Sequence, residues 1–171
     1  MERRAFSIEQ KGRTLTGYAA RFNSEANIGD FVEVIRPGAF ARTLAAPSAV
    51  NIRAIYEHDD KALLGRVGAG TLRLSEDENG LAFELDLPDT THGRDLAELV
   101  KRGDVAGCSF GFMVAKDSWQ PGPLRELRDV DLIEITLTAR PAYDSTTVSL
   151  RSRVGDCPRL ALARRYLEAI A

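Results

Sequence analysis

Apolar and polar residues alternate with a period of two along much of this 171-residue chain. Such alternation is typical of β-strands that bury one face. Glycine, proline and asparagine separate the alternating runs and supply turns between them. The pattern predicts strands at 6–8, 15–19, 31–35, 50–56, 63–67, 71–74, 81–87, 105–114 and 132–137. The turn at 76–80 predicts that the strands on either side of it form a hairpin.

A few segments have helical spacing instead. A short helix is expected at 37–44, where proline stands in the first turn. The clearest helix runs from about Thr91 to Arg102, because Thr90 or Thr91 can cap its start and Gly103 can end it. The tail from Asp156 also has helical spacing. Since strands outnumber helices, the pattern predicts an α+β fold built on a mainly antiparallel sheet or small barrel.

Composition and charge narrow the classes of protein. Hydrophobic residues make up 44% and charged residues 28% of the chain, with a net charge of −2, which argues against a nucleic-acid surface. No apolar run is long enough to cross a membrane, and the start of the chain lacks the apolar core of a secretory signal. We therefore expect a cytoplasmic site of action, or one inside a particle assembled in the cytoplasm.

The length suits one domain, which we place at 1–150, followed by a basic helical tail at 151–171. The tail carries five arginines against two acids. A solvated helix face explains this charge, and docking on an acidic partner is the alternative.

Candidate chemistry lies near the ends of predicted strands. Of the two histidines, His58 follows strand 50–56, whereas His92 stands at a helix start, where a polar residue is unremarkable. On strand 105–114, Cys108 and Phe110 would share the core face, while Ser109 lies on the opposite face between two glycines. This asymmetry favours Ser109 over Cys108 as a nucleophile, because a cysteine among core residues is usually a buried structural residue.

An acidic residue completes the set. If Ile133 and Ile135 point inward, Glu134 lies on the same kind of face as Ser109. Asp131, which opens the strand, is the alternative. A serine hydroxyl becomes a good nucleophile when a base takes its proton and a third group orients that base. Each residue also has an ordinary explanation, as a turn histidine or a solubility charge on an edge strand. Histidine spacing gives no metal site, and no histidine follows the serine as an α/β-hydrolase fold requires.

Several strings, taken together in this order, resemble the prohead (capsid maturation) serine proteases of tailed phages, which are related to the herpesvirus assemblin-type proteases. The resemblance covers roughly residues 5–150. It includes segments 17–23, 33–40, 56–59, 63–66, 80–84, 107–112 and 134–143.

The resemblance implies a herpesvirus-protease-like barrel with a few surrounding helices, and a prohead protease domain at 1–150. It makes His58 the base, Ser109 the nucleophile and Glu134 the third member. Arg140 is a candidate for oxyanion support, and backbone N–H groups are equally plausible donors. No cofactor and no metal are implied.

The function implied is a serine endopeptidase that cleaves scaffold or capsid-protein segments, and in some cases itself, within the assembling prohead. The expected partner is the major capsid protein or a scaffold segment, with self-association as a further expectation and with no nucleic acid and no membrane. An inactive relative that acts as an assembly or scaffold factor is the alternative. A phage and a phage-derived gene-transfer particle fit the sequence equally well.

Overall fold

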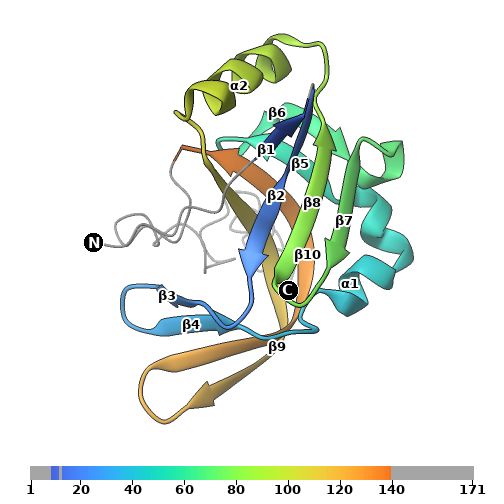
Figure 1. Ribbon diagram of the computed structural model, residues 1–171. Helices are drawn as coiled ribbons and strands as arrows, with labels where there is room; N and C mark the ends of the chain where they lie inside the picture. The colour runs from blue at the N-terminus through green and yellow to red at the C-terminus, as the bar shows by residue number, and fades with distance from the viewer. Residues whose placement is uncertain (1–8, 12, 140–171) are drawn as a thin grey trace, which may run out of the picture.

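The structure is a computed structural model that describes residues 9–11 and 13–139 (Figure 1). Its elements, in chain order, are β1 (Glu9–Lys11), β2 (Thr14–Arg21), β3 (Glu25–Asn27), β4 (Val32–Ile35), α1 (Ala41–Ala45), η1 (Pro47–Asn51), β5 (Arg53–Tyr56), β6 (Asp59–Arg66), η2 (Val67–Ala69), β7 (Leu72–Glu76), β8 (Gly80–Asp86), α2 (Thr91–Arg102), β9 (Gly107–Gln120) and β10 (Leu124–Thr138). None of the helices in this part of the chain is long and apolar enough to cross a membrane.

The strands form two sheets. The first has the order β1-β2-β8-β7 with antiparallel neighbours, and the second has the order β3-β4-β10-β5-β6 with β9 also paired to β10. Strand β10 runs parallel to β4 and to β5, and antiparallel to β9. A fold with many strands and few helices agrees with the predicted α+β class, but the second sheet mixes parallel and antiparallel pairs, and the described strands form no closed barrel. Alternation reveals that a segment is a strand, whereas its direction and partner depend on distant residues. The herpesvirus-like fold stays a prediction.

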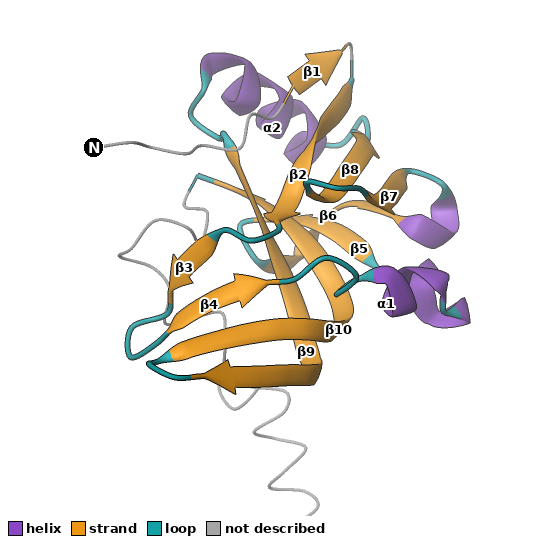
Figure 2. Ribbon diagram, turned by 60° about the horizontal axis from the view of Figure 1, so that its bottom comes forward, coloured by secondary structure: helices purple, strands orange, loops and turns teal. Residues whose placement is uncertain are grey.

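The two sheets enclose one hydrophobic core. Leu15, Leu81 and Leu85 enter it from the first sheet, and Leu127 and Ile135 enter it from the second. Strands β9 and β10 extend beyond this core into an arm that also contains β3 and β4, as Figures 1 and 2 show. The long β9–β10 hairpin therefore belongs both to the core and to the arm.

Helix α2 begins and ends where the sequence predicts. The Thr90 side chain accepts a hydrogen bond from the Gly93 backbone N–H at 3.3 Å, which caps the first turn. Gly103 ends the helix in the left-handed conformation, with φ of 82°. Leu96 is fully buried and fastens the helix to the rest of the protein.

Other boundaries differ from the prediction. Residues Pro47–Asn51 form a 3₁₀ helix, so β5 begins only at Arg53, and the side chain of Val50 is half exposed. The strands predicted at 105–114 and 132–137 are the inner parts of the longer β9 and β10, whose outer parts carry many charged residues that hide the alternation. Helix α1 is shorter than predicted, and β3 was not predicted. The strand predicted at 6–8 and the tail helix lie outside the described residues.

Candidate active site

Strands β5, β10 and β9 lie next to one another and carry the candidate residues. Thr136 on β10 pairs with Ile55 on β5 and with Ser109 on β9. Two residues earlier, Glu134 pairs with Gly111 on β9. Paired residues point to the same side of a sheet, and side chains alternate along each strand. Ser109 and Glu134 therefore share the face opposite to that of the core.

His58 lies at the tip of the hairpin that joins β5 to β6. Tyr56 pairs with Asp59, so Glu57 and His58 form a two-residue loop. Both loop residues have positive φ, 48° at Glu57 and 57° at His58. This is the geometry of a type I′ turn, which normally contains asparagine and glycine. A residue with a side chain loses roughly 1–2 kcal/mol in the left-handed region, so the rest of the structure must hold this turn in place.

Glu134 is the carboxylate that His58 contacts. Its Oε1 lies 3.6 Å from His58 Nδ1, and its Oε2 lies 3.6 Å from an Arg53 guanidinium nitrogen. The Thr136 hydroxyl donates to Oε1 at 3.4 Å. The Glu134 side chain is only 15% exposed, whereas that of His58 is 49% exposed. The structure thus brings the predicted base and the predicted third member together at the edge of the solvent.

A bulge in β10 corrects one part of the strand-face argument. Ile135 is fully buried as predicted, but the ladder shifts between Leu132 and Glu134, and Ile133 between them is 41% exposed. The extra residue of a bulge leaves the alternation, which is why Ile133 does not point inward. Glu134 keeps its predicted face because the alternation resumes after the bulge.

Ser109 lies on the predicted face but not at the surface. Its exposure is only 1%, so the small glycines on either side of it do not leave the serine open to solvent. From its pairing with Thr136, its Cα lies diagonally from that of Glu134, a separation of about 7–8 Å for such neighbours. A Cβ at Gly111 would come within 2.9 Å of Glu134 Cγ, so the glycine gives the carboxylate its space.

Cys108 takes the place predicted for it in the core. It is 1% exposed, and its thiol donates a hydrogen bond to the backbone oxygen of Ser109, with Sγ 3.5 Å from that oxygen. Phe110 is also buried, whereas Val114, four residues further along β9, is 38% exposed because the strand has by then passed into the arm.

The remaining predicted residues lie elsewhere. Asp131 accepts a hydrogen bond from Arg42 at 2.7 Å, and the same guanidinium binds Asp129, so Asp131 links α1 to β10. These two carboxylates raise the pKa of Arg42, Asp129 contributing more. His92 lies in the first turn of α2. Arg140 lies outside the described residues.

Two residues near His58 were not predicted. Arg53 pairs with Glu134 across the parallel β5–β10 ladder and also contacts Asp60 at 3.0 Å. Glu57 binds the end of β10, where Thr138 and the Ala139 backbone N–H both donate to its carboxylate. No sequence signal identifies Arg53, because its role depends on the parallel pairing. For Glu57 the signal was its place in the Tyr-Glu-His-Asp string.

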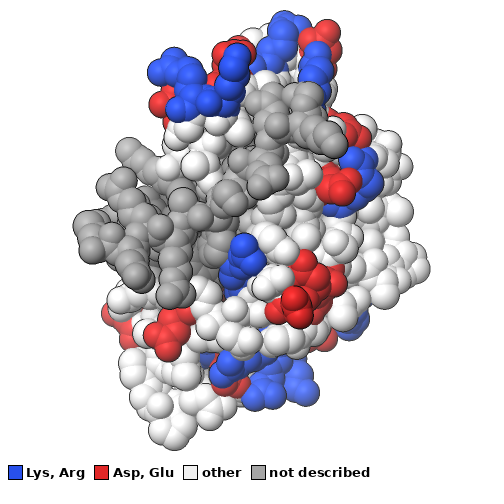
Figure 3. Space-filling view, in the orientation of Figure 1, with Lys and Arg blue, Asp and Glu red and all other residues white. Residues whose placement is uncertain are grey.

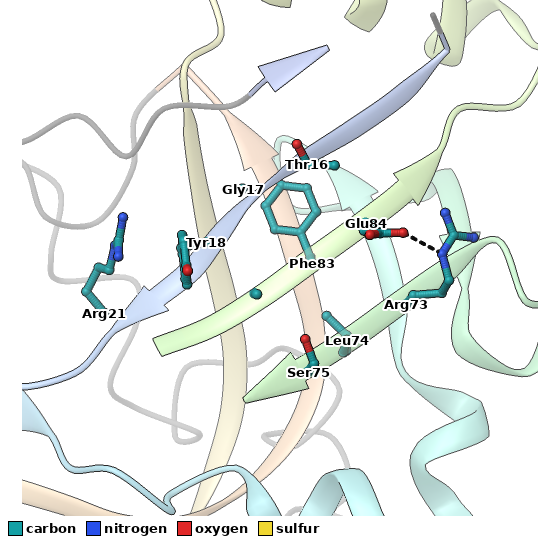
Figure 4. A pocket seen from close by; sticks show the side chains of 10 residues that line it. Thr16, Gly17, Tyr18, Arg21, Arg73, Leu74, Ser75, Phe83 and Glu84 are labelled. Atoms are coloured by element: carbon teal, nitrogen blue, oxygen red, sulfur yellow. Dashed lines mark hydrogen bonds and ion pairs between the residues drawn. The ribbon is translucent and has the colours of Figure 1, made fainter. Parts of the chain in front are cut away.

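An open hollow lies over the first sheet, away from these residues. Thr16, Tyr18, Arg21, Arg73 and Glu84 are among its lining residues (Figure 4). Its two arginines each contact another residue of the hollow, since Arg73 Nε donates to Glu84 at 2.8 Å and the Arg21 guanidinium carbon lies 3.7 Å from the Tyr18 ring centre. Positive and negative side chains are interspersed over the face of the molecule in Figure 3. Within the described residues, no three metal-binding side chains come together.

The arrangement around His58 is suited to proton transfer. A neutral imidazole carries one hydrogen, and a carboxylate beside Nδ1 favours that nitrogen as its position. Nε2 is then left with a lone pair that can accept a proton. The carboxylate also stabilises the imidazolium that forms when Nε2 is protonated.

Comparisons with known proteins show which family the chain resembles. The family model described as "Caudovirus prohead serine protease" matches residues 1–157. A relative named "Prohead protease", from Enterobacteria phage HK97, is 30% identical over 153 residues, which are 87% of this chain and 64% of the relative. The chain thus spans less than two thirds of that relative's length. No solved structure was found to match the chain significantly.

Proposed function

The chain belongs to the caudovirus prohead serine protease family, and we propose that it acts there as a serine endopeptidase with His58 as base, Ser109 as nucleophile and Glu134 as the orienting carboxylate. The observation that carries the proposal is the contact of His58 Nδ1 with Glu134, which supplies a base and its orienting group. Glu134 lies on β10, and the candidate hydroxyl of Ser109 belongs to β9, the strand that pairs with β10.

The reaction would proceed in two stages. Ser109 Oγ attacks the carbonyl carbon of the scissile peptide while its proton passes to His58 Nε2, and the resulting imidazolium then protonates the leaving amine. In the second stage, water attacks the acyl-enzyme, His58 takes a proton from that water, and the proton returns to Ser109 as the acid product leaves. Glu134 stabilises the imidazolium in both stages. Arg140 or backbone N–H groups are candidates for stabilising the oxyanion.

The proposed substrates are segments of the major capsid protein or of a scaffold, with the chain itself as a further substrate. The relative's name, "Prohead protease", supports this class of substrate. The reaction would then take place within the assembling prohead, where enzyme and substrate are held at high local concentration. Association of the chain with itself is part of the same proposal.

The test is to incubate the purified chain with the major capsid protein proposed as its substrate and to map the new termini by mass spectrometry. Ser109→Ala should abolish cleavage, whereas Ser118→Ala, on the same strand but in the arm, should leave it intact. His58→Ala should be nearly as damaging as the Ser109 change, because base and nucleophile act as a unit. His92→Ala is the matched histidine control, and a dead His92 variant beside an active His58 variant would refute the assignment of the base.

The burial of Ser109 is the observation that favours the alternative, an inactive relative that acts as an assembly factor. A fluorophosphonate probe separates the two functions, because it modifies a serine only when that serine is reachable and activated. Modification of Ser109 in the wild type, lost in His58→Ala, supports the protease. An unmodified Ser109 together with normal particle assembly supports the assembly factor.

A further inference from the structure

The turn that presents His58 is unfavourable by its own sequence. Glu57 and His58 both adopt positive φ, which a two-residue type I′ turn requires and which glutamate rarely adopts. Without an outside contact, this pair of residues has little reason to hold one conformation. The position of the imidazole therefore depends on what the turn binds.

Glu57 supplies such a contact through both its backbone and its side chain. Its N–H donates to the Leu137 carbonyl at 3.1 Å. Its carboxylate accepts from the Thr138 hydroxyl at 2.9 Å and from the Ala139 N–H at 2.7 Å. By contrast Asp59, on the other side of His58, accepts from the Lys61 N–H at 2.8 Å within its own strand.

The end of β10 that Glu57 binds also borders the other two candidate residues. Thr138 pairs with Gly107, two residues before Ser109 on β9. Thr136, two residues before Thr138, donates to Glu134. Three hydrogen bonds of Glu57 thus hold the turn that carries His58 against the end of β10. Strand β10 carries Glu134 and pairs with β9, the strand of Ser109.

We propose that Glu57 is a positioning residue for His58. It takes no part in bond making, and it holds the hairpin tip against β10 so that Nδ1 of the imidazole faces Glu134. This proposal rests on the proposed function for its effect on the reaction. Its structural part concerns the imidazole alone and can be measured even in a protein that cleaves nothing.

The experiment uses the full chain and three variants. Glu57→Ala removes both side-chain acceptors. Glu57→Gln keeps the acceptor for the Ala139 N–H, and its amide can donate to the rotatable Thr138 hydroxyl. Asp59→Asn is the matched control, because it also removes one negative charge next to His58 but leaves the β10 contacts in place. The readouts are the rate of Ser109 modification by a fluorophosphonate, kcat and KM on a mapped peptide, the ¹⁵N NMR signals of His58 and the melting temperature.

Glu57→Ala should lower the modification rate and kcat by about 10²-fold, the cost of misplacing a catalytic group by about 1 Å, while KM changes little. The His58 signals should change from one dominant neutral tautomer, protonated at Nδ1, to a mixture. Glu57→Gln should stay within several-fold of the wild type, and Asp59→Asn should match the wild type. If Glu57→Ala does not fold, Thr138→Val removes one of the bonds and should show the same tautomer change with a smaller loss of rate.

The proposal is overturned if the folded Glu57→Ala protein keeps the wild-type rate and tautomer, or if Asp59→Asn is equally damaging. The second result would mean that charge near the imidazole matters, and not the attachment to β10. If wild-type Ser109 does not react at all, the proposed function fails, and the tautomer comparison still decides whether Glu57 positions His58.

Discussion

Strand β10 places two carboxylates in two environments. In its outer part, which pairs with β4, Glu126 accepts from Arg36 Nε at 3.1 Å and from Arg128 Nη2 at 2.6 Å. In its inner part, which pairs with β5, Glu134 has looser contacts: His58 and Arg53 each lie at 3.6 Å, and the Thr136 hydroxyl donates to it at 3.4 Å. Both side chains are mostly buried, with exposures of 7% and 15%.

The difference separates a structural carboxylate from a candidate catalytic one. Two guanidinium groups, which are always charged, surround Glu126 and lower its pKa to about 2, Arg36 contributing more than Arg128. Glu134 faces an imidazole, whose charge changes when it takes up a proton. Burial and an acidic side chain are therefore common to both, and the kind of partner decides between them.

Among substitutions on β10, Glu134→Gln should have the largest effect on activity. The amide keeps the size of the side chain but cannot stabilise an imidazolium, and it can favour the wrong histidine tautomer. We expect turnover to fall by about 10³–10⁴-fold with little change in KM, as is usual for the third member of a triad. Single-turnover cleavage of a mapped peptide measures this, with Glu126→Gln as the control. A Glu134→Gln variant with near wild-type turnover would remove Glu134 from the proposed site.

The second prediction concerns Glu126→Gln and stability. The substitution replaces the charge-assisted hydrogen bonds that Arg36 and Arg128 donate to a mostly buried carboxylate with weaker hydrogen bonds to a neutral amide. We expect the melting temperature to fall by several degrees, while turnover per folded molecule stays close to that of the wild type. A loss of turnover in the fully folded variant would contradict the division of β10 into two parts.

The difference between the two parts could not be predicted from the alternation of residues alone. Alternation found the inner halves of β9 and β10, and capping residues gave both ends of α2, because these signals are local. The pairing of β10 with β4 and β5 joins segments distant in sequence. The contact of Arg36 with Glu126 and that of Arg53 with Glu134 both depend on this pairing. The burial of Ser109 also depends on tertiary packing. The residues proposed for the site were predicted from short sequence motifs that occur in a fixed order. The left-handed turn at His58 could be recognised only from the backbone angles of the structure.

The third prediction uses the pKa of Glu126. A folded-state pKa of about 2, against an ordinary value of 4.5, means that the unfolded chain binds this proton more readily than the folded one. The stability that Glu126 contributes is therefore complete above about pH 4.5 and is lost as the pH falls towards 2. The gap in melting temperature between wild type and Glu126→Gln should be constant from pH 7 to 5 and should narrow by pH 3. A gap that does not change over this range would contradict the assignment.

The smallest expected effect is that of Asp131→Asn, which lies between the two parts of β10. Its carboxylate is 44% exposed and binds Arg42, which is 49% exposed. Exposed ion pairs contribute little to stability, and Arg42 keeps its contacts with Asp129 in the variant. We expect the melting temperature and the turnover to stay close to those of the wild type. Both variants are measured on the same peptide, and a large loss of turnover in Asp131→Asn would transfer the role of orienting carboxylate to Asp131. Arg42 would then have to release Asp131 during the reaction.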